Sequence, residues 1–154
     1  MSELRTNKIY PRDGLPAGAS GGGIVQIVQS QVASSVSSTT STYADTGLSA
    51  SITPTSSSNK ILVIVYTGHC SKTAADTQLD FKVFRDSTEI YFFSSLNTNS
   101  AVADSSNITI HYLDSPATTS SITYKTQVRN RNDIGTITSN FNGSAEMTLM
   151  EVSG

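Results

Sequence analysis

The fold is decided by one apolar stretch near the middle of the chain, Ile61-Leu62-Val63-Ile64-Val65-Tyr66. Four of its six residues are β-branched, which favours an extended strand. Successive side chains of a strand point to opposite faces, so both faces of this strand are apolar and both need to be covered. We expect an opposing sheet to cover one face and a partner chain to cover the other.

Segments of alternating apolar and polar residues lie on both sides of this stretch. The strands that they predict span residues 24–29, 48–52, 61–66, 79–83, 90–93, 108–112, 122–128, 136–141 and 145–152. Residues 34–42 form either a short strand or a loop, and residues 71–78 a helical turn. Asn142-Gly143 predicts a type I′ turn that joins the last two strands as a hairpin. About eight or nine short strands predict an all-β fold, an antiparallel β-sandwich or jelly roll.

The composition argues against several classes of protein. Ten Lys and Arg against twelve Asp and Glu, with a formal net charge of −2, give no electrostatic footprint for nucleic acid. No apolar run reaches the length of about 18 residues that a membrane helix needs, and no secretory leader opens the chain. A single cysteine forms no internal disulfide. We therefore expect no nucleic-acid partner, no membrane insertion and no disulfide scaffold.

Small hydroxyl residues are abundant and charged residues are scarce. The chain contains 26 Ser and 20 Thr, whereas charged residues make up 14%. Two explanations fit this composition: either hydroxyl groups cover the outer strand faces, or much of the surface is hidden in an oligomer. Composition alone leaves both open.

The first 23 residues differ from the rest of the chain. Charged residues are frequent over residues 1–13, and Pro11, Pro16 and the run Gly21-Gly22-Gly23 follow. Proline removes a backbone donor and glycine adds backbone freedom, so this segment is neither a helix nor a central strand. We expect residues 1–23 to form an extended arm with a glycine-rich hinge, and residues 24–154 to form one β-sandwich domain.

Few residues are arranged for chemistry. His69 and Cys70 are adjacent in a strand, so they point to opposite faces and cannot easily bind one metal ion. A buried cysteine and a surface histidine are expected instead. The run 18–23 lacks the Lys and Ser/Thr of a phosphate loop, and no Gly-x-Ser-x-Gly motif occurs. These patterns predict no cofactor, no metal site and no enzymatic activity.

Carboxylates offer the remaining catalytic alternative. Asp76 and Asp80, and likewise Asp104 and Asp114, flank predicted turns or strands, and a glycan hydrolase would need two carboxylates across a cleft. Aspartates in turns more commonly accept local hydrogen bonds. We therefore place a hydrolase last among the hypotheses.

Two further groups could contact a ligand. Lys125, Gln127, Arg129 and Arg131 share one strand face, which suits an acidic glycan, a partner protein or a solvated surface. The run Tyr91-Phe92-Phe93 offers either rings for stacking on a sugar or apolar packing.

Two segments carry a resemblance to a known group of proteins. MSELRTNKIYPRDG at residues 1–14, followed by the glycine run and Ile24-Val25-Gln26, resembles the N-terminal segment of tail-fibre and related virion proteins of tailed bacteriophages. Residues 43–54, followed by residues 58–63, are similar to a recurrent β-domain of the same proteins. Together the two segments cover about a quarter of the chain.

The resemblance implies a homotrimeric virion structural protein, assembled in the host cytoplasm, whose arm attaches to other virion proteins of the tail, baseplate or capsid. The residues implied to dock are Leu4, Arg5, Lys8, Ile9, Tyr10, Arg12 and Asp13, and the implied hinge residues are Gly21, Gly22 and Gly23. This chain is shorter than a typical fibre and has no shaft repeats. A short tail fibre, a baseplate-associated fibre and a capsid decoration protein therefore all stay open, as does binding of a host surface glycan.

Overall fold

The computed structural model describes residues 23–95 and 104–154, which form ten strands and, within those residues, no helix. The larger sheet contains β1 (Ile24–Val32), β2 (Val36–Ser38), β4 (Lys60–Lys72), β7 (Asp104–Asp114), β9 (Ile137–Ser139) and β10 (Ala145–Val152). The smaller sheet contains β3 (Ala44–Ile52), β5 (Leu79–Arg85), β6 (Thr88–Ser95) and β8 (Ile122–Asn130). The predicted all-β fold is confirmed.

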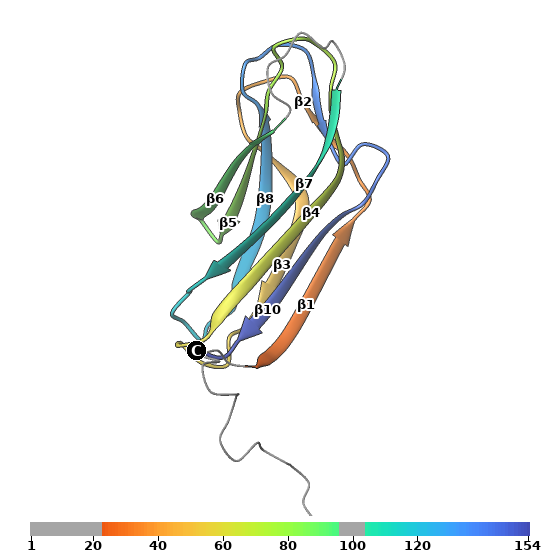
Figure 1. The fold of residues 1–154 in the computed structure, drawn as a ribbon. Helices are drawn as coiled ribbons and strands as arrows, with labels where there is room; N and C mark the ends of the chain where they lie inside the picture. The colour runs from red at the N-terminus through yellow and green to blue at the C-terminus, as the bar shows by residue number, and fades with distance from the viewer. Residues whose placement is uncertain (1–22, 96–103) are drawn as a thin grey trace, which may run out of the picture.

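All strand pairs are antiparallel, and the two sheets lie face to face (Figure 1). In the six-stranded sheet β4 is central: it pairs with β7 on one side, and with β10 and then β9 on the other. β1 pairs with β10 and forms an edge of this sheet. The four-stranded sheet has the order β3-β8-β5-β6.

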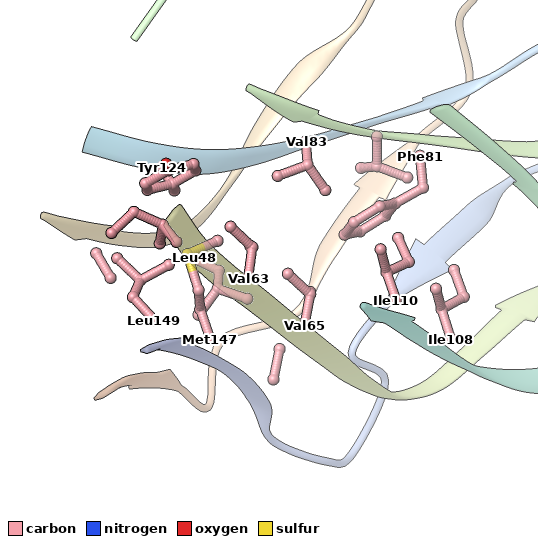
Figure 2. Packing of buried hydrophobic residues seen from close by; sticks show 14 of the residues in the cluster. Leu48, Val63, Val65, Phe81, Val83, Ile108, Ile110, Tyr124, Met147 and Leu149 are labelled. Atoms are coloured by element: carbon pink, nitrogen blue, oxygen red, sulfur yellow. The ribbon is translucent and has the colours of Figure 1, made fainter. Parts of the chain in front are cut away.

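A single hydrophobic core fills the space between the sheets (Figure 2). Val63 and Val65 of β4 face Phe81 and Tyr124 of the opposite sheet, and all four side chains are fully buried. The inner residues alternate with outer ones on β3, β4, β8 and β10, as strands with one side against a core require. Each such side chain contributes roughly 1.5–3 kcal/mol by leaving water, so the alternation fixes which face of each strand is inside.

Most predicted strands are present, although their ends differ. β4 continues beyond Tyr66 as far as Lys72, and residues 34–42 contain only the short strand β2. The helical turn predicted for residues 71–78 is wrong. Lys72 still belongs to β4, and Asp76 has a φ of 58°, which a right-handed helix excludes. Thr77 is fully buried there, and its hydroxyl is satisfied because it donates to the Ile134 carbonyl at 2.6 Å.

The hairpin predicted at Asn142-Gly143 is also wrong. β9 and β10 do not pair with each other; they lie end to end along the same side of β4. The pairing of β4 with β7 shifts register between Thr67 and Cys70, and the link between β9 and β10 crosses this bulge. There Gly68 N–H donates to the Ser144 carbonyl at 3.0 Å, and Phe141 N–H donates to the His69 carbonyl at 2.8 Å. Long-range pairing with β4 therefore prevails over the local turn preference.

This crossing generates a stability prediction for Gly68. A Cβ atom added at Gly68 would lie 2.9 Å from the Ser144 backbone oxygen. The backbone at the bulge must therefore move in the Gly68→Ala variant. We expect a loss of about 1–3 kcal/mol in the free energy of unfolding, measured by chemical denaturation. Gly23→Ala is the control, because a Cβ there meets nothing within 4 Å. Equal stability of the two variants would contradict the proposed close approach.

Candidate functional site

The six-stranded sheet exposes an apolar outer surface. The side chains of β1, β10, β4 and β7 that point away from the core include eight large apolar or aromatic ones, which we call the apolar face. Its members are Ile24, Ile27, Leu62, Ile64, Tyr66, Leu113, Met150 and Val152. The stretch that decides the fold thus supplies the core with its odd-numbered residues and the apolar face with its even-numbered ones.

Strand register orders the apolar face into rows that cross the sheet. One row, the apolar row, is apolar on all four strands: Ile27 pairs with Met150, Met150 with Leu62, and Leu62 with Leu113. Residues opposite each other on neighbouring antiparallel strands are in contact distance, so this row is continuous.

The rows on the two sides of the apolar row differ. On the side where β1 begins, the end row contains Ile24, Val152 and Lys60. On the other side, two rows are polar except on β4. These glutamine rows consist of Gln29, Thr148, Ile64 and His111, and then Gln31, Glu146, Tyr66 and Thr109. Apolar side chains are therefore concentrated at the end of the sheet that is nearest to the start of β1.

Several side chains of the apolar face are more exposed to solvent than apolar side chains usually are. Ile24 is 59% exposed, Ile27 56% and Leu113 49%, and Tyr66 is also exposed. Single exposed apolar residues are ordinary in soluble proteins, but a contiguous exposed patch marks a contact site. The apolar face is thus the surface of the described chain with the clearest capacity to bind another macromolecule.

The outer face of the four-stranded sheet is charged instead. The predicted stripe lies there, on β8 and on Arg131 directly after it, and each of its cations contacts a carboxylate. Lys125 lies 3.2 Å from Asp45, and Arg129 and Arg131 both bind the buried Asp80 at 2.9 Å. Pairing of these cations leaves little free positive charge, which favours the solvated-surface interpretation of the stripe.

Two aromatic rings lie among these charges. The Tyr43 ring is contacted by Lys82 Nζ at 4.4 Å and by the Arg129 guanidinium at 4.6 Å from its centroid. Phe92 is 43% exposed, and the Arg131 guanidinium lies 5.7 Å from its centroid. Its neighbours Tyr91 and Phe93 pack against the core, so only the central residue of the predicted aromatic run is available to a ligand.

A small surface pocket lies beside this charged face. The pairing of β3 with β8 shifts register between Asp45 and Ser49, and Gly47 adopts a φ of 81° in the bulge. The bulge opens a pocket of about 90 Å³, lined in part by Asp45, Ser49 and Lys125. It is smaller than the 300–1,000 Å³ usual for small-molecule sites.

The carboxylates considered for hydrolysis serve as ion-pair partners. Asp80, near the start of β5, accepts from Arg129 and Arg131, whereas Asp114 accepts from Arg85 and Tyr124. Arg85 is the last residue of β5, so Asp80 and the arginine that binds Asp114 are roughly 17 Å apart along the backbone of that strand. A glycosidase pair needs about 5–9.5 Å. Asp76 is exposed in a turn, and the side chain of Asp104 lies outside the described residues.

His69 and Cys70 are separated as expected. His69 is exposed and forms an edge contact with Phe141, whereas Cys70 is fully buried. Over residues 23–95 and 104–154, no three or more His, Cys, Asp or Glu side chains are grouped to hold a metal ion. The same residues contain no helix that could span a membrane.

Most of the predicted docking and hinge residues lie outside the described part of the chain. They are Leu4, Arg5, Lys8, Ile9, Tyr10, Arg12, Asp13, Gly21 and Gly22, and of the named residues only Gly23 lies within it.

A buried carboxylate fixes the end of the sheet where the apolar side chains gather. Glu151 points inward from β10 and is fully buried. It accepts hydrogen bonds from Gln26 at 2.6 Å, from Asn59 at 2.6 Å, and from the backbone and hydroxyl of Thr55 at 2.7 and 2.8 Å. One charge thus joins β1, β10 and the loop between β3 and β4. The alternation of residues 145–152 places Glu151 on the inner face. A charged residue at a core position was therefore the sequence signal that could have revealed this buried carboxylate.

The Glu151 contacts predict a pH-dependent stability. Burial raises the pKa of Glu151, but the hydrogen bonds from Asn59, Gln26 and Thr55 outweigh it and lower the pKa to about 2. The stabilisation is complete above the unfolded value of 4.5 and is lost as the pH falls toward 2. We expect Glu151→Gln to lower the melting temperature at pH 7 and to reduce its fall between pH 5 and pH 2.

Glu146→Gln is the matched control on the same strand. Glu146 points outward and accepts from Gln31 at 3.0 Å, so its replacement is expected to change stability by at most about 0.5 kcal/mol. Identical pH profiles of the Glu151→Gln and wild-type chains would contradict the role of Glu151.

No protein-family model matches this chain, and no curated protein matches it.

Proposed function

We propose that this chain is a non-enzymatic structural protein of a phage virion, of the short tail-fibre or baseplate-associated fibre type. Residues 24–154 form its jelly-roll-like β-sandwich body, which works as a homotrimer, and residues 1–23 attach it to other virion proteins. The observation that carries the homotrimeric part of this proposal is the apolar face, because a contiguous exposed apolar patch marks a contact site. The virion role follows from the resemblance of residues 1–14, 43–54 and 58–63 to virion proteins.

The charged face supports the same division of roles. Its cations and carboxylates are paired with one another. The pairs Lys82–Glu89 and Lys125–Asp45 are partly exposed, and such pairs keep a surface hydrated while adding at most about 1 kcal/mol of stability each. A body with one apolar and one hydrated face suits a subunit that packs on one side and faces solvent on the other.

The attachment role of the arm is testable in the phage. A chain that lacks residues 1–20 keeps β1 and the whole described body, so it is expected to fold with the circular dichroism spectrum and melting temperature of the full chain. We expect its amount in purified particles, measured by mass spectrometry, to fall at least tenfold. Normal incorporation of the shortened chain would contradict arm docking, and absence of the full chain from particles would contradict the virion role.

The position on the particle separates two versions of this proposal. A capsid decoration protein would use the same arm and oligomer to bind the shell. Density for the chain in an electron-microscopy map of the particle assigns it to the tail, the baseplate or the capsid.

A receptor-binding or glycan-binding module is the second candidate, and one observation favours it. Phe92 presents an exposed ring on the charged face, and an exposed aromatic ring of this kind is suited to stacking on a sugar. On an array of acidic and neutral polysaccharides, Phe92→Ala is expected to weaken binding at least fivefold. Ile134→Ala, at a similarly exposed residue, is the control. Equal binding by both variants would reject this site.

A further inference from the structure

We infer that the occupant of the apolar face is the same face of another copy of this chain, packed so that the strands of the copies run in the same direction. This inference rests on the self-association included in the proposed function but needs no virion. It names the contacting surface, its orientation and the end of the body at which the N-terminal arms are brought together.

The charges of the face point to a second copy. Among the described outer residues of the four rows, only Lys60, Glu146 and His111 are ionisable apart from Tyr66, and Gln31 already binds Glu146 at 3.0 Å. A nucleic acid or an anionic membrane would require clustered cations on this surface. A nearly neutral face of apolar, glutamine and threonine side chains is compatible with itself, because two copies of it can pack together without bringing like charges into contact.

The size of the face also suits a contact between copies. Four strands spaced about 4.8 Å apart, over the seven residues from Lys60 to Tyr66, cover a flat area of roughly 450 Å². Two copies would bury about twice this area, and protruding side chains add to it. The total approaches the ~1,000 Å² of a specific interface only when the whole face is used. In a homotrimer, three faces are covered together, so the assembly buries about three times the area of one face while each copy shares its face between two neighbours.

The rows determine the orientation. A rotation axis parallel to the strands keeps each row at its own level, so the apolar row meets the apolar row and the glutamine rows meet glutamine rows. An axis across the strands, through the centre of the face, would place the apolar row on the neighbouring glutamine row. The Gln29 amide and the His111 imidazole would then be covered by Ile27 and Leu113, which offer them no hydrogen-bond partner.

This orientation has a consequence for the N-termini. β1 begins at Ile24 in the end row, and Gly23 precedes it directly. Packing with strands in the same direction brings the Gly23 ends of all copies to one end of the assembly. Arms that leave from one end can contact one attachment surface together, which multiplies a weak individual contact.

The first test compares matched substitutions on the two outer faces. Leu113→Asp places a charge in the apolar row, and Phe92→Asp places the same charge on the opposite sheet at similar exposure. We expect the full chain to show a molar mass by light scattering that is a multiple of 16.3 kDa, threefold for the homotrimer. Leu113→Asp should weaken association at least tenfold, whereas Phe92→Asp should leave it unchanged; circular dichroism confirms that both variants fold.

The second test reads the orientation by disulfide crosslinking between chains. Val152 and Lys60 share the end row, whereas Glu146 lies six residues from Val152, about 20 Å along β10. A mixture of Val152→Cys and Lys60→Cys chains should crosslink, and a mixture of Val152→Cys and Glu146→Cys chains should not. The native Cys70 is buried and does not compete.

The outcomes separate this inference from the proposed function. A monomeric full chain, an unchanged mass for Leu113→Asp, or crosslinking only of the Val152→Cys and Glu146→Cys mixture would overturn the inference. Absence of the full chain from purified particles would overturn the virion role and leave the crosslinking result standing.

Discussion

β4 has apolar side chains on both of its faces, and the rest of the structure follows from this one strand: its inner face builds the core and its outer face is left to the surface. Its inner residues Ile61, Val63 and Val65 are fully buried and hold the two sheets together. Its outer residues Leu62, Ile64 and Tyr66 cannot be buried by the opposite sheet, because a strand has only one side toward that sheet. The strand that stabilises the core thus creates the apolar face, on which the proposed self-association depends.

The scarcity of charge has a positional explanation. In the described body, the cations of β5 and β8 lie on the outer face of the four-stranded sheet or at its end, and they are paired with carboxylates. Within the four rows of the other outer face, Lys60 and Glu146 lie at opposite ends, and the apolar row between them is uncharged. The ion-paired cations of the described strands β5 and β8 thus belong to the four-stranded sheet, whereas the apolar row of the other sheet carries no charge.

Period-two patterning was sufficient to predict the strands and their inner faces, because burial of one face fixes the register of each strand. It could not predict which strands pair. Asn142-Gly143 has the composition of a tight turn, yet β9 and β10 both pair with β4, and the bulge at Gly68 separates them. The Glu151 contacts and the rows of the apolar face also depend on pairing between distant segments. A two-sided apolar strand could be recognised in the sequence, but the arrangement of its neighbours needed the fold.

The most direct test of self-association through the apolar face is the rate at which peroxide oxidises Met150, followed by mass spectrometry at increasing protein concentration. Met150 lies at the centre of the apolar row and is partly exposed in the isolated chain, whereas Met147 is fully buried in the core. Oxidation follows exposure. If copies cover the apolar face, the Met150 rate falls as concentration rises while Met147 stays slow throughout. The contradicting result is a Met150 oxidation rate that stays constant as the protein concentration rises and stays well above the Met147 rate.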